Sequence, residues 1–365
     1  MKKPIDKTGT SGSLNEDVYI ASIAITTPPY TVDQPRAEAF LIKHYAKKLS
    51  PERLAIMHRM FSHPGIARRH LAVDDLEQLV NEHPDDRIAR FTNRAVDLSS
   101  EAINDALAQV DLPVDAISGL VVNTCTGYIC PGISTYLIEK LGISHQIQAY
   151  DLVGSGCGGA IPNLQMCRNM ANKTAAGVIM SVSVEICSAT FQMDDDLSLI
   201  VSNAIFADGA SAALIWQRPV GLGLTLIDSV SRFDPKYRDD IRYIYKNGKL
   251  YNQISVLIPK IAGKLVAKVI SDLFKPRGLR IEDIRYWVFH PGGTKVINAI
   301  RDEVGLSEKH FQATRKILAN FGNMSSPTVW FVLKEILNEG TTPGDWCVMV
   351  SFGAGMSAHA FLLKT

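Results

Sequence analysis

One cysteine, Cys157, lies in the small-residue run DLVGSGCGGA (151–160), between a predicted strand at 147–153 and a predicted helix at 161–170. Four glycines in this run remove side chains around the sulfur and permit close approach of other groups. The free N–H donors at the start of a helix favour a thiolate. Cys157 is therefore either a nucleophile or a small residue that fills a packed turn.

Two further loops carry side chains suited to acid–base and hydrogen-bond chemistry. His290 ends an apolar segment in VFHPGGTK (288–295), where two glycines bend the chain. Asn323 lies in FGNMSSPTVW (321–330), just before a serine–proline pair that is typical of a helix start. Taken singly, the histidine is either a site residue or a hydrogen-bonded structural one, and the asparagine is either an amide donor or a turn residue.

The three loops gain meaning when they are considered together. Each polar side chain follows an apolar segment at a bend, and the strand ends of an α/β sheet share one edge. A cysteine nucleophile, a histidine base, and a histidine and an asparagine that donate to an oxyanion form a set suited to acyl transfer. The sequence therefore predicts that Cys157, His290 and Asn323 meet at one thioester carbonyl.

Strand-like and helix-like segments alternate along nearly the whole chain, which predicts a layered α/β fold around a buried sheet. A helix start is predicted at Ser50–Pro51. The main predicted strands are 18–25, 119–124, 177–184, 210–216, 285–289 and 346–352, and the main predicted helices are 34–48, 88–109, 253–274, 295–304 and 327–338.

No low-complexity linker divides the chain, so the turn at 218–221 is the best predicted boundary. This gives a flexible polar tail at 1–17 and an N-terminal half at 18–218 that carries the cysteine. The C-terminal half at 219–365 carries the histidine and the asparagine.

Composition excludes several classes of function. With 365 residues, 38 basic and 37 acidic side chains and a net charge of +1, nothing points to nucleic acid or an anionic membrane as a partner. No apolar run reaches the roughly 18 residues of a membrane span, and the N-terminus lacks the apolar core of a secretory signal. The six cysteines show no CxxC pairing, so we expect a cytoplasmic protein without a disulfide scaffold or zinc site.

The glycine-lined cysteine, HPGG and GNMSS, in this order and spacing, resemble the type III polyketide synthases, the chalcone-synthase-like family, in its bacterial branch. The similarity extends from about residue 18 to the C-terminus and includes CTGYICPG (125–132), AIFADGASAALI (204–215) and SFGAGMSAH (351–359). It implies a thiolase-type fold, with two duplicated halves in five αβαβα layers, and a homodimer. It also implies an acyltransferase that takes an acyl-CoA starter, extends it with malonyl-CoA and cyclises the product, without a metal or redox cofactor.

The resemblance also implies roles for individual residues. Cys157 would be the nucleophile and acyl carrier, while His290 and Asn323 would activate it, bind thioester carbonyls and stabilise the enolate left by decarboxylation. A thiolate–imidazolium pair would keep the sulfur reactive near neutral pH. Phe206 matches a gatekeeper between the coenzyme A tunnel and the cavity, although a core aromatic is the simpler interpretation from the sequence alone.

Further positions match substrate-binding sites of the family. Glu185 matches a buried acid that holds either an ordered water or a structural hydrogen bond. Arg59 matches the basic cluster for coenzyme A phosphates, with an ordinary solvated charge as its alternative. Cys130 stands where a dimer partner's side chain is inserted. The remaining matched positions are Cys125, Thr126, Cys187, Thr190 and Ser325.

Some positions depart from the plant pattern. The loop at 351–355 lacks its proline, and Ile56 and His63 replace lysines of the basic cluster, for which Lys295 and Arg69 are candidate replacements. We therefore expect a fatty acyl-CoA starter and an alkylpyrone, alkylresorcinol or related phenolic product. The competing hypotheses are a ketoacyl synthase III-type enzyme with one condensation, an acyl-CoA thioesterase and a non-catalytic acyl-binding scaffold.

Overall fold

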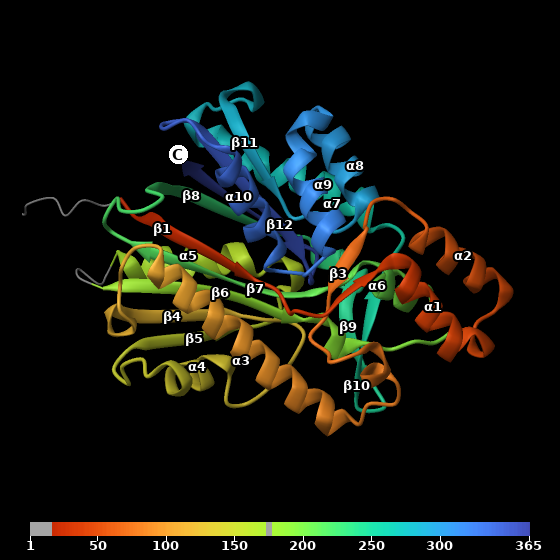
Figure 1. Cartoon of the computed structure of the whole chain (residues 1–365). Helices are drawn as coiled ribbons and strands as arrows, with labels where there is room; N and C mark the ends of the chain where they lie inside the picture. Colours follow the sequence, from red (N-terminus) through yellow and green to blue (C-terminus); the bar gives the residue numbers. More distant parts are fainter. Residues whose placement is uncertain (1–16, 173–176) are drawn as a thin grey trace, which may run out of the picture.

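A computed structural model describes residues 17–172 and 177–365, so the predicted tail lies outside it except for Asp17. The described chain forms one nine-stranded sheet with helices on its faces, and two short two-stranded sheets beside it (Figure 1). The α/β class predicted from the alternation of segments is confirmed.

The first five strands of the large sheet run in the order β5-β4-β6-β7-β1. Strand β4 is parallel to β5 and β6, whereas β7 is antiparallel to both β6 and β1. Their bounds are β1 (Tyr19–Thr26), β4 (Ile117–Asn123), β5 (Gln148–Leu152), β6 (Val178–Ile186) and β7 (Asp208–Trp216).

The other four strands repeat this arrangement in the order β11-β12-β13-β8. Strand β11 is parallel to β12, and β13 is antiparallel to β12 and β8. Their bounds are β8 (Leu224–Phe233), β11 (Ile284–Phe289), β12 (Trp346–Gly353) and β13 (Ser357–Lys364). Among the named strands only the counterpart of β5 is missing, so the topology is that of a duplicated unit, joined where β8 pairs with β1.

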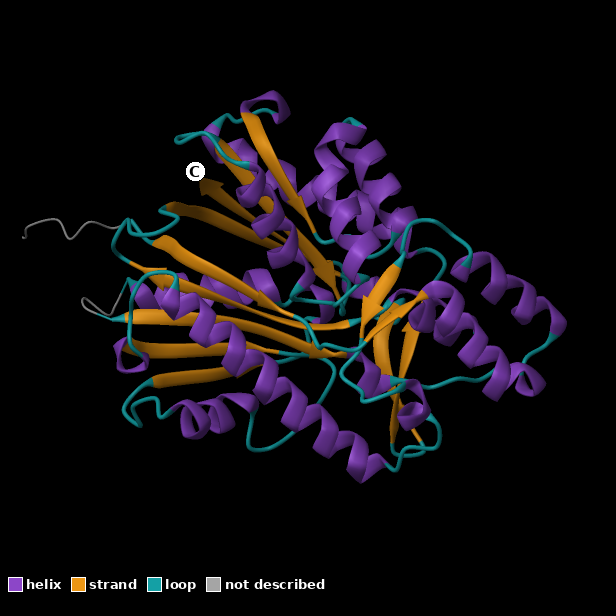
Figure 2. Ribbon diagram, in the orientation of Figure 1, coloured by secondary structure: helices purple, strands orange, loops and turns teal. Residues whose placement is uncertain are grey.

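Helices complete five layers (Figure 2). Two helices cover the outer face of the first strand set, two cover the outer face of the second, and two lie between the sets. In the same order these are α3 (Pro84–Ala108) and α4 (Ile133–Leu141), α7 (Ile258–Phe274) and α8 (Thr294–Val304), and α5 (Ala160–Ala171) and α10 (Thr328–Glu339). The central pair is apolar on several sides, as burial between two sheets requires. This is the predicted αβαβα layering.

A smaller region lies at one end of the layers, on the right in Figure 1. It contains the two short sheets, and helix α6 packs against α2 and β10 within it. Its elements are β2 (Thr31–Asp33), α1 (Gln34–Tyr45), α2 (Pro51–Phe61), β3 (Arg68–His70), α6 (Leu197–Ile205), β9 (Ile241–Lys246) and β10 (Lys249–Ile254). Helix α9 (Gln312–Phe321) connects this region to the second half through its contacts with β3 and β11.

Most predicted elements are present with ends shifted by a few residues. The helix start at Ser50–Pro51 is confirmed, because the Ser50 hydroxyl accepts a hydrogen bond from the Arg53 amide. The helix predicted at 253–274 begins only at Ile258, since 253 and 254 belong to β10. Within the described residues, no helix combines the length and the apolar character that a membrane crossing needs.

Candidate active site

Cys157 lies in the 3-10 turn η4 (Gly156–Gly158), directly before α5. Gly154 and Gly156 have φ of +92° and +55°, the left-handed region that favours glycine. The end of β12 packs tightly on this turn at Gly353. Any side chain there would clash, since a Cβ on Gly353 would lie 2.2 Å from the Ser155 carbonyl oxygen. The glycine run is therefore required by both the turn and its neighbour, and it leaves Cys157 buried.

Ser325 and Asn323 connect the sulfur to a second loop. The Ser325 hydroxyl donates a 3.2 Å hydrogen bond to Cys157 Sγ, and the Ser325 amide donates to Asn323 Oδ1 at 2.8 Å. Asn323 Nδ2 in turn donates to the Gly292 carbonyl at 2.8 Å, two residues after His290. A chain of three hydrogen bonds thus brings together the three loops that the sequence singled out.

His290 follows β11, and its amide donates to the Val350 carbonyl on β12 at 2.9 Å. Its buried ring meets the Phe352 ring edge-on, with centroids 5.2 Å apart. Among the described residues neither ring nitrogen has a hydrogen-bond partner. The end of β12 also contacts the turn of Cys157, since Ser351 Oγ donates to the Gly158 carbonyl at 3.0 Å. The imidazole thus follows a strand whose neighbour, β12, contacts the turn of Cys157, and both of its nitrogens are buried and unpaired in the described structure.

Burial dominates the electrostatics of the site. It raises the pKa of Cys157 to about 12, against the lowering effect of the Ser325 hydrogen bond, and it lowers the pKa of His290 to about 3. No hydrogen bond joins the two groups, because both imidazole nitrogens are unpartnered. Burial thus acts in the direction of a neutral thiol and a neutral imidazole, opposite to the thiolate–imidazolium pair expected from the sequence, which stays a prediction.

Glu185, at the end of β6, organises the wall beside Cys157. Its Oε2 accepts from the amides of Cys125 and Thr126 at 2.9 and 3.2 Å and from the Thr126 hydroxyl at 2.9 Å. Its Oε1 accepts from the Ser326 hydroxyl at 2.7 Å. Burial raises its pKa, and these donors oppose that rise. The structure thus shows Glu185 in several protein hydrogen bonds.

Cys125, Cys187, Thr190 and Phe206 lie around the same centre. Cys125 Sγ is 3.5 Å from the Ser325 hydroxyl. Cys187 and Phe206 border one cavity, and the Thr190 hydroxyl closes the turn η5 (Cys187–Thr190) by donating to the Cys187 carbonyl at 2.9 Å. Of the predicted site residues, only Arg59 has no contact with this network; it is exposed on α2.

Tyr243 is a site residue that the sequence did not indicate. It lies on β9, and its hydroxyl is 3.4 Å from the Thr190 hydroxyl. Burial raises its pKa strongly, and the neighbouring Cys125 and Cys187 thiols raise it further. Alternation along β9 could indicate which face Tyr243 occupies, but the packing of the β9–β10 hairpin on η5 has no signature in the sequence.

Arg69 was a candidate replacement for the missing lysines, and that expectation is wrong. Its guanidinium is buried and donates to the carbonyls of Asn203 and Phe206 at 2.7 and 2.9 Å, so it is not available to a phosphate at the surface. Lys295 is exposed at the start of α8. Within the described residues no group of three or more His, Cys, Asp or Glu side chains could hold a metal ion.

Comparison with known proteins identifies the family. Residues 13–223 match the family described as FAE1/type III polyketide synthase-like protein, and residues 229–365 match the C-terminal domain of chalcone and stilbene synthases. The chain belongs to the type III polyketide synthase family. It is therefore an acyltransferase that uses acyl-CoA and malonyl-CoA, and the prediction from its motifs is confirmed.

Individual relatives agree with this assignment to the type III polyketide synthases. The chain is 28% identical over 317 residues to 3,5-dihydroxyphenylacetyl-CoA synthase of Streptomyces toyocaensis, covering 84% of this chain and 81% of the relative. Its fold matches PKS-I of the brown alga Ectocarpus siliculosus with a TM-score of 0.88, at 26% identity over 96% and 98% of the two chains. It also matches 1,3,6,8-tetrahydroxynaphthalene synthase of Streptomyces coelicolor A3(2), with a TM-score of 0.88 at 21% identity over 95% and 99%. The thiolase-type fold is thus confirmed.

Proposed function

We propose that Cys157 is the nucleophile and acyl carrier of this polyketide synthase, with His290 and Asn323 as its catalytic partners. The observation that carries this assignment is the hydrogen-bond chain from the Cys157 sulfur through Ser325 and Asn323 to the loop of His290. In the loading step, a free nitrogen of His290 takes the thiol proton while the sulfur attacks the acyl-CoA carbonyl. The carbon–sulfur bond to coenzyme A then breaks, and the coenzyme A sulfur receives the proton.

Extension begins when malonyl-CoA loses carbon dioxide and negative charge develops on its thioester oxygen. His290, kept neutral by burial, can donate one N–H to this oxygen. Asn323 Nδ2 uses one proton toward Gly292 and has a second for the same oxygen. The resulting carbon nucleophile attacks the thioester on Cys157, and the bond between the acyl carbon and the Cys157 sulfur breaks. The sulfur leaves as thiolate and regains a proton, while the chain, two carbons longer, is now carried by the coenzyme A of the extender.

Two helix starts support negative charge at this place. Helix α5 begins three residues after Cys157, and α10 begins three residues after Ser325. The N-terminal ends of helices carry partial positive charge and free N–H groups. Both central helices therefore favour the anions that form on sulfur and oxygen during the reaction.

The starter that we propose is an aliphatic, fatty acyl-CoA, and the product an alkylpyrone, an alkylresorcinol or a related phenolic. The departures from the plant pattern support this choice, and two relatives are named as synthases of phenolic compounds. Cys125, Cys187, Thr190 and Tyr243 are the residues whose size and polarity would set the room for the growing chain.

The experiment is an assay of the purified enzyme with malonyl-CoA and acyl-CoAs of increasing length, followed by mass spectrometry of products and protein. We expect an acyl adduct on Cys157, absent in Cys157→Ala, and products that contain several malonyl-derived units. Lack of product from every aliphatic starter, or product from malonyl-CoA alone, would reject the proposed starter. A product with a single added unit would instead indicate a ketoacyl synthase III-type reaction, and free acid a thioesterase.

A homodimer is the assembly that fits the exposed edge of the large sheet. Strand β5 is an edge strand, and Tyr150 within it and Val153 just after it are 40% and 57% exposed. An unpaired strand edge that exposes large apolar side chains is a natural surface for a second copy related by twofold symmetry. Cys130 is also exposed, in the loop before α4. The cytoplasm, with its reducing conditions and coenzyme A thioesters, is the proposed location.

A further inference from the structure

The turn η5 carries Cys187 and Thr190 of the proposed cavity wall, and Ser188 lies between them. Ser188 borders the same cavity as Cys187 and Phe206, but its polar atoms are engaged by residues behind the wall. The Ser188 hydroxyl donates to Asp208 Oδ2 at 2.6 Å, and its amide donates to Asp208 Oδ1 at 2.8 Å. The hydroxyl also accepts from Arg90 Nη1 at 2.8 Å, and the carbonyl accepts from Arg90 Nη2 at 3.2 Å. An acid and a guanidinium thus use every polar atom of this one residue.

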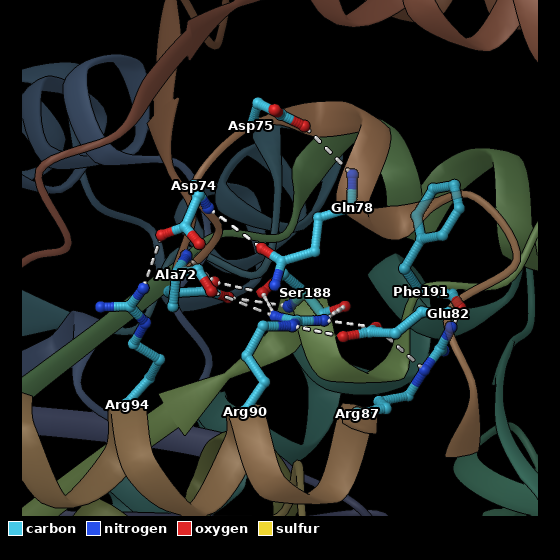
Figure 3. Close-up of polar contacts among 11 residues, drawn as sticks. Ala72, Asp74, Asp75, Gln78, Glu82, Arg87, Arg90, Arg94, Ser188 and Phe191 are labelled. Atoms are coloured by element: carbon cyan, nitrogen blue, oxygen red, sulfur yellow. Dashed lines mark hydrogen bonds and ion pairs between the residues drawn. The ribbon is translucent and has the colours of Figure 1, made fainter. Parts of the chain in front are cut away.

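Arg90 is itself fixed in one orientation (Figure 3). Its Nε and Nη2 pair with the two carboxylate oxygens of Glu82 at 2.7 and 2.8 Å, a two-point geometry that restricts the guanidinium plane. Both side chains are buried, with 5% and 4% of their surface exposed. Arg90 also donates to the Ala72 carbonyl at 3.2 Å, so the chain around residue 72 joins the cluster.

Two more contacts extend this control along the cavity wall. Arg87, one turn before Arg90 on α3, donates to the carbonyl of Phe191, the residue that follows η5, at 2.5 Å. Asp208, the first residue of β7, accepts from the Ala72 amide at 2.6 Å and lies two positions after Phe206. The cluster therefore fixes both ends of η5 and the start of the strand that follows the proposed gatekeeper.

Burying such charged groups gives little net stability, because loss of hydration offsets most of the attraction between them. The buried cluster instead restricts geometry, since few conformations of the turn η5 keep all these hydrogen bonds at once. We propose that Ser188, held by Arg90 and Asp208, is a positioning residue that fixes the Cys187–Thr190 wall and thereby sets how many malonyl units the chain gains before release. This inference rests on the proposed placement of that wall at the cavity.

The test compares product length in Ser188→Ala and Arg90→Met with the unmodified enzyme, at equal amounts of folded protein. Both variants should load Cys157 at an unchanged rate, but the ratio of products with different numbers of malonyl units should shift at least about threefold. Arg94→Met is the matched control, because Arg94 lies one turn further along α3 and pairs at 2.7 Å with the exposed Asp74 (Figure 3). An unchanged ratio in Ser188→Ala and Arg90→Met would overturn the inference.

A substitution in the wall itself distinguishes two questions: whether the Cys187–Thr190 wall lies at the cavity, and whether Ser188 controls it. Thr190→Val removes the hydroxyl that bonds to the Cys187 carbonyl and approaches Tyr243. If this variant shifts product length while Ser188→Ala does not, the wall lies at the cavity but Ser188 does not control it. If neither shifts it, the placement of the wall itself is wrong. A product ratio does not depend on how much enzyme is folded, so loss of stability alone would not imitate the expected result.

Discussion

The backbones of Phe206 and Asn323 run side by side, although 117 positions separate them along the chain. The Asn323 amide donates to the Ile205 carbonyl at 2.8 Å, and the Asn323 carbonyl accepts from the Ala207 amide at 2.9 Å. Arg69 Nη1 also donates a hydrogen bond to the Phe206 carbonyl. The same backbone pairing therefore holds the proposed gatekeeper and the proposed oxyanion donor, so a substitution that shifts the backbone at one of them should also displace the other.

Replacing Asn323 with alanine should lower kcat by about 10²–10³-fold, because one donor to the developing oxyanion is lost. The measurement is release of carbon dioxide from malonyl-CoA, together with product formation. The adduct on Cys157 should still form, though more slowly. A variant that decarboxylates at the normal rate would contradict the role given to Asn323. The melting temperature is the control for loss of the hydrogen bond to Gly292.

Removing the Ser325 hydroxyl should make the cysteine less reactive in the free enzyme. Its hydrogen bond lowers the pKa of Cys157, which burial holds at about 12. Alkylation of Cys157 should rise about tenfold for each pH unit between pH 7 and 10 without a plateau. In Ser325→Ala it should be roughly fivefold slower at each pH, as expected for a hydrogen bond worth about 1 kcal/mol. Ser326→Ala, which leaves the sulfur contact intact, is the control; a plateau near pH 7 would contradict the argument.

Acid should destabilise the fold through two buried imidazoles. Burial lowers the pKa of His290 to about 3 and that of His359 to about 4, from an ordinary value near 6.5. Both imidazoles have a lower pKa in the folded than in the unfolded protein, so below pH 6.5 the unfolded state binds protons that the folded state does not. Their contribution to the free energy of unfolding is therefore complete above pH 6.5 and is lost as the pH falls toward 4. Each imidazole contributes a slope of about 1.4 kcal/mol per pH unit in that window. Denaturant unfolding at several pH values tests this, and His359→Gln should remove part of the slope.

Arg59 should affect binding of coenzyme A thioesters without affecting chemistry. It is exposed near the end of α2, and the loop that follows packs on the start of α8, where Lys295 is exposed too. Arg59→Ala should raise the KM for malonyl-CoA roughly fivefold, in line with loss of one charge-assisted contact to a phosphate, and leave kcat unchanged. Arg53→Ala on the same helix is the control. An unchanged KM would favour the interpretation of Arg59 as an ordinary solvated charge.

A charge on the edge of the large sheet should disrupt the proposed dimer. Tyr150→Lys places an ammonium group on β5, where it would oppose its own copy across a twofold axis. Light scattering should show a dimer for the unmodified enzyme and a monomer for the variant. Ile88→Lys, at an apolar residue 52% exposed on α3, should leave the dimer unchanged. If the unmodified enzyme is already a monomer, the proposed dimer is rejected.

The sequence predicted what depends on local pattern and on motif. The glycine turn at Cys157, the helix start at Ser50 and the alternation of strands and helices follow from neighbouring residues. The pKa directions of Cys157 and His290 could not be predicted, because they depend on burial by distant segments. Tyr243 was missed for the same reason: β9 indicates a face, but only the folded hairpin shows what that face meets.

The repeated strand order brings two equivalent helix starts to the site, and these two starts carry different groups. Helices α5 and α10 follow the same position in the two repeats, and their starts supply the thiol of Cys157 and the hydroxyl of Ser325. Two copies of one half related by symmetry would place identical residues at these equivalent positions, whereas two halves of one chain need not, so a thiol on one side can meet an alcohol on the other.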